Sequence, residues 1–407
     1  MSEIAVVVPT FQRAALLRLT LDGLLRQTLN ADRFEVIVTD DGSNDGTVDV
    51  MRSFAKELDL QYVYHHDLGH RVAATRNAGA GAATAPVLVF MDAGTRPSAG
   101  CIEAHLLAHK AAECGGSPTV VVGRVFGYDS RVASDGEIMG DTQDVPPPVG
   151  DMRDDELDRF SRELEDVLLP WRLAWTANLS VDAKVFHSAG GFDERFVGWG
   201  AEDTELAYRL HRYGARFRWS DEACAIEYPH RRDTAANFAS NARNQRLFHE
   251  LHPDPEVEIF LATRTTGQDV HDSIAEYRAW VAAAAPPAPD GMSSGPADTA
   301  PADTAPVQGS VPIQARRATF GSSAYGQADV VINPFGSANS GQQAIKVHQA
   351  IGLRTRLPDK CFETVTVQER HYGPLWERWA DEILREAQRI ARDVTVDSGP
   401  LTAVLVL

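Results

Sequence analysis

The sequence predicts an α/β protein whose first unit is a mostly parallel, Rossmann-like sheet. Short β-branched runs alternate with segments of helical periodicity over residues 1–125, the pattern of strands joined by crossover helices. The chain has 407 residues, and one hydrophobic core stops growing at roughly 250–300 residues. A segment rich in Ala and Pro at 282–310 marks a boundary. We therefore expect at least two folding units.

Each element of the first unit is predicted from its local pattern. The predicted strands are 4–8, 34–38, 87–91 and 119–123. The predicted helices are 12–27, 45–58, 70–83 and 98–114. Residues 151–169 read as a charged amphipathic helix. A further helix is expected to open with two acids at Glu202 and to stop at Gly214.

The second unit comes after a segment that cannot bury much apolar surface. Residues 282–310 repeat PADTA and lack bulky apolar side chains, so we expect a flexible linker there. Residues 328–334 look like a strand and 374–393 like a helix, which predicts a small α/β or α+β unit. The expected domains are 1–269 with halves 1–125 and 126–269, a helical extension at 270–281, the linker, and an accessory unit at 311–407. A chain shortened to end near Asp269 is expected to fold and to act on its donor. The alternative is that the strand at 330–332 and the helix at 374–393 pack onto the first unit and are needed for its fold.

Composition and charge exclude several classes of protein. The 57 acidic residues outnumber the 39 basic ones and give a net charge of −18, which argues against bulk electrostatic binding to nucleic acid or anionic membrane. No apolar run approaches the roughly 20 residues of a membrane-spanning helix. The four cysteines form no CxxC pair, and the N-terminus carries no signal-type leader. We expect a cytoplasmic protein without a transmembrane segment, and the oligomeric state stays open.

Polar and turn-forming residues come directly after three of the predicted strands. Parallel sheets bind ligands beyond the carboxyl ends of their strands. The residues at those ends are Pro9, Thr10 and Phe11, then Asp40 and Asp41, then Asp92, Ala93 and Gly94. The DDGS segment at 40–43 alone is more often a turn before a helix cap. Its place in a series of such motifs favours a binding site.

These motifs resemble the nucleotide-sugar-binding half of family 2 glycosyltransferases, which have the GT-A fold. The resemblance lies in VVVPTFQR, VTDDGSNDGT, HRVAATRNAG and VFMDAG. WTANLSVDAKVFHSAGGFDERFVGWGAEDTELAYRLHRYG is similar to the acceptor half, close to the C-terminal module of β-1,4-galactosyltransferases. The resemblance covers residues 4 to about 250. It implies inverting transfer of a hexosyl or N-acetylhexosaminyl group from a UDP-linked donor to a hydroxyl of a saccharide, peptide or small molecule.

The resemblance also implies which residues bind the donor. They are Pro9, Thr10, Phe11, Arg13, Asp40, Asp41, Arg71, Arg76, Asn77, Asp92 and Ala93. Asp41, helped by Asp40, would accept hydrogen bonds from the base or the ribose. One of Arg71 and Arg76 would face the diphosphate or the base, because guanidinium pairs well with phosphate oxygens. A solvated helix face is the competing interpretation for Arg71.

The metal motif of the family is incomplete in this chain. The family usually has Asp-x-Asp, and this sequence keeps Asp92 but has Gly94 in place of the second acid. One carboxylate can suffice when waters and substrate phosphates complete the shell of Mn²⁺ or Mg²⁺. His230 stands where related enzymes have a late metal-binding histidine, although a lone histidine is often structural. The resemblance implies a divalent cation held by Asp92 and His230, and Gly94→Asp is expected to tighten its binding.

The segment GWGAED at 198–203 predicts the catalytic step. By resemblance, Asp203 is the general base, since a desolvated carboxylate can take the proton of the acceptor hydroxyl. Glu202 would bind hydroxyls of the sugars. Trp199, Gly200 and Asn178 are the expected acceptor-binding residues. Two acids at a helix start can also serve merely to complement the helix dipole.

Two other functions remain open on the sequence. A nucleotide-sugar-binding protein without turnover, acting through its C-terminal unit, would explain the missing second acid. A sugar-phosphate nucleotidyltransferase fits less well, because no Gly-rich phosphate loop bearing Lys or Arg lies near the N-terminus. Release of UDP from a UDP-sugar on addition of an acceptor would separate an active transferase from the binding protein.

Overall fold

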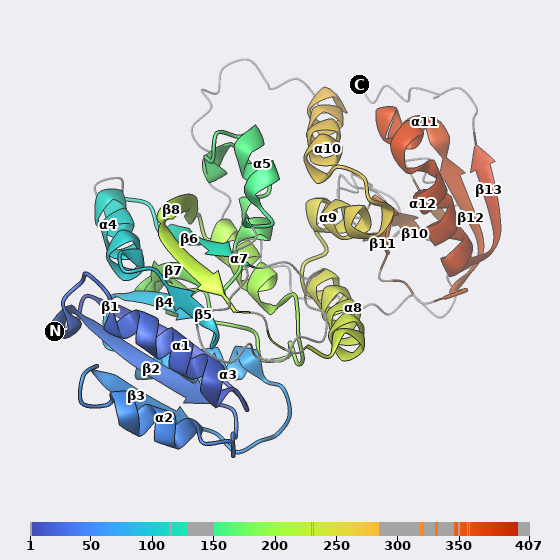
Figure 1. Cartoon of the computed structure of the whole chain (residues 1–407). Helices are drawn as coiled ribbons and strands as arrows, with labels where there is room; N and C mark the ends of the chain where they lie inside the picture. The colour runs from blue at the N-terminus through green and yellow to red at the C-terminus, as the bar shows by residue number, and fades with distance from the viewer. Residues whose placement is uncertain are drawn as a thin grey trace. The chain divides into compact units, whose positions relative to one another are not determined.

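The structure is a computed structural model of the chain. It describes residues 2–113, 116–127, 150–228, 230 and 232–284, and in the C-terminal part 317–320, 330–332, 346–348, 351–355, 357 and 359–397. Its contacts divide the chain into two compact units, Met1–Gln245 and Arg246–Leu407 (Figure 1).

The first unit is built on an eight-stranded sheet of order β3-β2-β1-β4-β7-β6-β8-β5. The strands are β1 (Ile4–Thr10), β2 (Phe34–Asp40), β3 (Leu60–Tyr64), β4 (Val87–Met91), β5 (Thr95–Pro97), β6 (Thr119–Phe126), β7 (Asn178–Asp182) and β8 (Arg216–Glu227). Strands β3, β2, β1 and β4 are parallel, as are β6 and β8. Strand β7 is antiparallel to β4 and β6, and β5 is antiparallel to β8. The predicted mostly parallel sheet is confirmed.

Helices connect these strands. The four predicted helices are confirmed as α1 (Ala14–Leu25), α2 (Thr47–Phe54), α3 (Val72–Ala82) and α4 (Cys101–Glu113). The others are α5 (Asp154–Arg159), α6 (Ala183–Ser188), α7 (Glu202–Arg212) and α8 (Thr234–Leu251), with short 3₁₀ turns η1 (Ala31–Arg33), η2 (Leu164–Asp166) and η3 (Pro170–Leu173). In the part of the chain that the structure describes, no helix is both long and apolar enough to cross a membrane.

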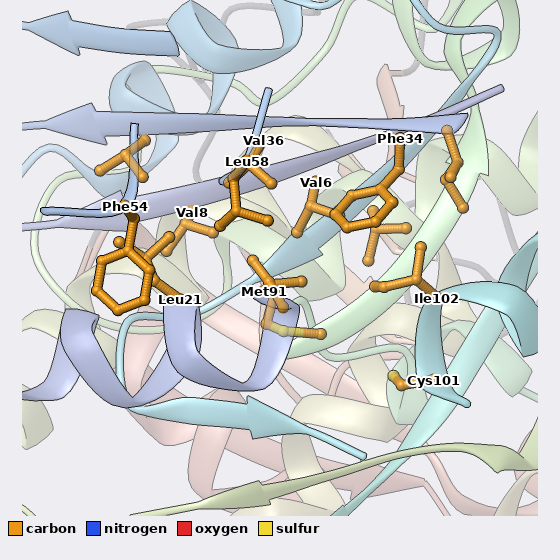
Figure 2. Close-up of a cluster of buried hydrophobic side chains, with 14 of the residues drawn as sticks. Val6, Val8, Leu21, Phe34, Val36, Phe54, Leu58, Met91, Cys101 and Ile102 are labelled. Atoms are coloured by element: carbon orange, nitrogen blue, oxygen red, sulfur yellow. The ribbon is translucent and has the colours of Figure 1, made fainter. Parts of the chain in front are cut away.

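A hydrophobic core fixes the strand ends that carry the predicted site. Figure 2 shows Val6, Val36 and Met91 from three neighbouring strands packed among side chains such as Leu21 of α1 and Ile102 of α4. Every residue of β1 is buried, which explains why this strand reads as a continuous apolar run rather than an alternating one. The central strands are therefore held rigidly, and so are the residues directly after them.

The predicted helix over 151–169 is wrong. Helix α5 ends at Arg159, and Ser161 and Arg162 have φ of 53° and 62°, which an α-helix cannot continue through. The Arg162 side chain instead pairs with Asp154 at 3.1 Å and with Asp221 of β8 at 2.9 Å. The charged residues that suggested one face of a helix instead form ion pairs that attach this segment to β8.

The second unit is an α/β unit, one of the two predicted alternatives. Its sheet has the order β11-β10-β9-β12-β13, and all its pairings are parallel. The elements are α9 (Pro255–Thr266), α10 (Val270–Ala284), β9 (Arg317–Phe320), β10 (Val330–Ile332), β11 (Lys346–His348), β12 (Phe362–Gln368), α11 (Glu369–Tyr372), α12 (Pro374–Ile390) and β13 (Ala391–Asp397). Helix α12 confirms the helix predicted at 374–393.

The boundary between the two units comes earlier in the sequence than the predicted boundary at Asp269. Helices α9 and α10 belong to the second unit, where Glu276 of α10 pairs with Arg378 of α12 at 2.6 Å. The compact units divide between Gln245 and Arg246. Residues 282–284 are the end of α10, and the rest of the predicted linker, 285–310, lies outside the described residues.

Candidate active site

The predicted donor residues gather at the carboxyl ends of β1, β2 and β4. Pro9 and Thr10 end β1, and Phe11 after them is 40% exposed. The backbone N–H of Asp41 donates to the carbonyl of Thr10 at 3.0 Å, which fastens the ends of β1 and β2 together. Asp92 comes directly after β4, and its side chain is 40% exposed. The sheet therefore brings these motifs to one edge.

Asp40 and Asp41 have different roles. Asp40 Oδ1 accepts from the backbone N–H of Ser43 at 2.8 Å, and its Oδ2 accepts from the Tyr62 hydroxyl at 2.6 Å. Asp40 thus shapes the turn after β2. Asp41 accepts from the backbone N–H of Arg71 at 3.0 Å and from its Nη2 at 2.7 Å. Asp41 therefore binds Arg71 and holds its guanidinium beside the end of β2.

Arg76 joins the two halves of the site. It is 3% exposed, and its Nη2 lies 2.8 Å from Asp92 Oδ1 while its Nη1 lies 3.1 Å from Glu202 Oε1. Burial opposes its charged form, but Asp92 and Glu202 favour that form and raise the pKa of Arg76. Two carboxylates neutralise Arg76 here, and its contact with the donor diphosphate or base stays a prediction.

Glu202 and Asp203 begin α7 after a tight turn. Gly200 and Ala201 have φ of 100° and 69°, which turns the chain into the helix. Glu202 is 5% exposed, and within the described ranges its Oε2 has no hydrogen-bond partner. Burial and then the charge of Glu202 raise the pKa of Asp203 to about 7, against a lowering by Arg76. A carboxyl that ionises near neutral pH can accept a proton from a hydroxyl.

Helix α8 holds the loop that carries Trp199. The Ser240 hydroxyl accepts from the backbone N–H of Trp199 at 3.1 Å and donates to its carbonyl at 3.0 Å. Asn244 Nδ2 donates to the carbonyl of Gly200 at 2.8 Å. A Cβ on Gly198 would lie 2.6 Å from the Ser240 Cβ, so only glycine fits. Ser240 and Asn244 were not predicted, because their only signal in the sequence is their i, i+4 spacing.

Two predicted binding residues have structural roles instead. Asn178 is fully buried in β7, where its Nδ2 donates to the carbonyl of Ala223 at 2.7 Å and its Oδ1 lies 2.9 Å from His105 Nε2. Asn77 exchanges hydrogen bonds of 2.9 and 2.8 Å with the backbone of Phe192. Both amides are satisfied within the fold, so the acceptor role of Asn178 and the donor role of Asn77 are not supported.

The side chains near Asp92 do not fit a divalent cation. Asp92 is paired with Arg76, and Gly94 offers no oxygen in its side chain. His230 Nε2 accepts from Arg232 Nε at 3.2 Å, and its Nδ1 lies 3.2 Å from the carbonyl of Tyr228. Burial, with Arg13 and Arg232, lowers the pKa of His230 to about 4. Among the described residues no three His, Cys, Asp or Glu side chains are grouped so as to hold a metal ion.

Arg13 and Glu227 complete the same edge of the sheet. Arg13 directly precedes α1, and burial lowers its pKa while Asp92 favours its charged form. Within the described ranges, Arg13 has no side-chain hydrogen bond or ion pair. Glu227 ends β8 and pairs with Arg232, and burial raises its pKa to about 7. Glu227 was not predicted, because nothing in ACAIEY shows that β8 pairs with β5 beside Asp92.

The structure reverses the expected effect of Gly94→Asp. Gly94 has φ of 106°, and a Cβ there would lie 3.2 Å from Leu16 Cδ2. We expect Gly94→Asp to lower the free energy of unfolding by about 1–2 kcal/mol without tightening Mn²⁺ binding. Gly100→Asp is the control, since no atom lies within 4 Å of a Cβ there and its φ is ordinary. Thermal unfolding with and without Mn²⁺ measures both. A stable Gly94→Asp protein with raised Mn²⁺ affinity would contradict the prediction.

The mostly parallel eight-stranded sheet with its connecting helices is the architecture of GT-A glycosyltransferases. The family model described as glycosyl transferase family 2 matches residues 5–137, and the one described as N-terminal domain of galactosyltransferase matches residues 159–231. The chain belongs to glycosyltransferase family 2.

Two relatives found by sequence have names that agree with this assignment. The chain is 36% identical to a validoxylamine A glucosyltransferase from Streptomyces hygroscopicus subsp. jinggangensis, over 97% of both chains. It is 30% identical to a chondroitin synthase from Escherichia coli, over 54% of this chain and 34% of that one. Among solved structures, S. aureus TarS 1–349 in complex with UDP-GlcNAc gives a TM-score of 0.45 at 16% identity, covering 68% of this chain and 70% of that one.

Proposed function

We propose that this glycosyltransferase moves a sugar from a UDP-linked donor to an acceptor hydroxyl by single displacement with inversion. The observation that carries the proposal is the bridge formed by Arg76. It brings Asp92 of the donor half and Glu202 of the acceptor half within 3.1 Å of one guanidinium, so Asp203 lies beside the strand ends. A base at that place can reach a hydroxyl opposite the leaving diphosphate.

The proposed reaction uses the acids of α7. The acceptor oxygen bonds to the anomeric carbon as the bond from that carbon to the β-phosphate oxygen breaks, and the electron pair stays on the phosphate. Asp203 takes the hydroxyl proton. The Oε2 of Glu202, unpartnered within the described ranges, accepts from a sugar hydroxyl. Trp199 offers an aromatic face to sugar C–H groups. No step runs through Mn²⁺ or Mg²⁺, because Asp92 and His230 are engaged by arginines.

The donor base and ribose are proposed to lie over the ends of β1 and β2. Phe11 is partly exposed there, and Asp41 is fixed by two hydrogen bonds from Arg71. Pro9, Thr10 and Ala93 are buried, so they would contribute to the donor site through their backbone atoms and by shaping its wall. Asp40 would act through the turn that it holds.

The identity to validoxylamine A glucosyltransferase supports a narrower version of the proposal. That relative matches over 97% of both chains, so the two share their acceptor halves as well as their donor halves. We propose that the transferred sugar is glucose and that the acceptor is validoxylamine A or a similarly small hydroxyl-rich molecule. A hexosyl donor is thus favoured over an N-acetylhexosaminyl one.

The test is a transfer assay with validoxylamine A and a panel of UDP-, GDP-, dTDP- and ADP-glucose, with UDP-GlcNAc as the competing donor. We expect a product heavier by one hexose and release of UDP that depends on the acceptor. The anomeric configuration of the product, read by NMR, tests inversion. Tight donor binding without product from any acceptor would instead favour a sugar-nucleotide-binding protein that acts through its C-terminal unit.

A further inference from the structure

We infer that Arg13, rather than a divalent cation, holds the diphosphate of the donor. This inference rests on the proposed function and assigns the leaving-group contact within it. Arg232 lies beside His230 at the same edge, but Glu227 already pairs with it. The Arg13 guanidinium would meet the charge that develops on the β-phosphate oxygen when the sugar leaves.

The arginines at this edge of the sheet differ in whether a carboxylate pairs with them. Arg71 is paired with Asp41 at 2.7 Å, and Arg76 with Asp92 at 2.8 Å and with Glu202 at 3.1 Å. Arg13 is half-buried, and in the described part of the chain no side chain pairs with it. A partly buried charge without a partner disfavours the fold, so a ligand anion is the partner that this arginine lacks.

The backbone on either side of Arg13 is held in place before any ligand binds. The backbone N–H of Gln12 donates to the Ser43 hydroxyl at 2.7 Å, and that of Ala14 donates to Asp45 Oδ2 at 2.8 Å. These bonds pin the residues on either side of Arg13 to the loop after β2. A side chain on a pinned backbone loses less freedom on binding an anion, which favours affinity.

Helix α1, which Arg13 directly precedes, packs against the segment after β4. The Thr20 hydroxyl of α1 accepts from the backbone N–H of Gly94 at 2.9 Å. Arg13 stands at the N-terminal end of this 12-residue helix, where the helix dipole also favours an anion. A second acid at the position of Gly94 would help to hold a metal ion, and the metal ion would neutralise the phosphate. In this chain Arg13 would take over the task of that metal ion.

Binding of nucleoside diphosphates tests the inference without relying on turnover. UDP, GDP, dTDP and ADP are titrated into the full-length protein by calorimetry, once in excess EDTA and once with Mn²⁺, beside the matching nucleosides. We expect at least one diphosphate to bind equally well in both conditions. Arg13→Gln should weaken that binding about 10-fold or more while leaving nucleoside binding unchanged. Arg13→Lys should give an intermediate affinity, because lysine keeps the positive charge but lacks the planar guanidinium that can donate two hydrogen bonds to one phosphate.

The control variant is Arg18→Gln, an exposed arginine of the same helix, which should bind like the wild type. Diphosphate binding that requires Mn²⁺, or that Arg13→Gln leaves unchanged, overturns the inference and leaves the proposed function standing. If none of the four diphosphates binds in either condition, the proposed function fails and the inference fails with it. The comparison of EDTA with Mn²⁺ uses the wild type, so a variant that misfolds does not prevent the test.

Discussion

Replacing Asp203 with Asn is expected to lower turnover by at least ~10²-fold while donor binding stays unchanged. The amide keeps the size of the side chain and its contact with the backbone N–H of Thr204, which Asp203 Oδ1 accepts at 2.7 Å. It cannot take a proton from the acceptor hydroxyl. Initial rates at saturating donor and acceptor, with donor affinity measured separately, show the effect. Asp49→Asn, an exposed acid on α2, is the control.

The pH dependence gives a second measure of the same assignment. Because Asp203 works as a base only when ionised, turnover of the wild type should rise with pH through about 7 and level off above it. The residual rate of Asp203→Asn should lack that rise. A fully active variant would sink the assignment.

The raised pKa of Asp203 also determines whether ionisation of this residue stabilises or destabilises the fold. The pKa of Asp203 is raised from 3.8 to about 7 in the fold, so its ionisation disfavours the folded state as pH rises through that window. Asn at position 203 cannot ionise, so the variant avoids this free-energy cost. The melting temperature of the Asp203→Asn protein at pH 8 should equal or exceed that of the wild type. Lost turnover with retained stability separates a catalytic role from a structural one.

The strand ends could be predicted from sequence because their signals are local. A buried apolar run that leads into Asp40 and Asp41, or into Asp92, identifies both the strand and its carboxyl end without any knowledge of distant residues. The acids at Glu202 and Asp203 were likewise found from a helix start after glycines. These predictions needed only the order of motifs along the chain.

The partners of those residues could not be predicted, because they depend on tertiary contacts. Arg76 meets Glu202, which lies 126 residues away, and no local pattern indicates that pairing. Glu227 reaches the edge only because β8 pairs with β5. Arg13 was named as a donor residue, but its lack of a partner among the described residues is visible only in three dimensions.

Glu258→Ala is expected to destabilise the second unit severely. The Glu258 carboxylate is buried in α9 and accepts four backbone N–H groups of the loop 351–354, at 2.7, 3.0, 2.6 and 2.8 Å. Alanine leaves these donors buried without an acceptor, at a cost of roughly 1–3 kcal/mol each when unpaired. We expect the free energy of unfolding of this unit to fall by about 4 kcal/mol or more, measured by urea denaturation.

Glu256→Ala is the matched control, two residues earlier on the same helix. Its carboxylate pairs with Arg278 at 2.6 Å in a partly exposed position, so its loss should cost less than about 1 kcal/mol. The same physics predicts that a chain ending near Asp269 aggregates, because it keeps Glu258 and the buried Ile259 but loses the loop and helices that belong to their unit. If Glu258→Ala proves as stable as Glu256→Ala, the four hydrogen bonds of Glu258 do not stabilise the second unit as expected. If the shortened chain stays folded, α9 belongs with the first unit, as the predicted boundary at Asp269 has it.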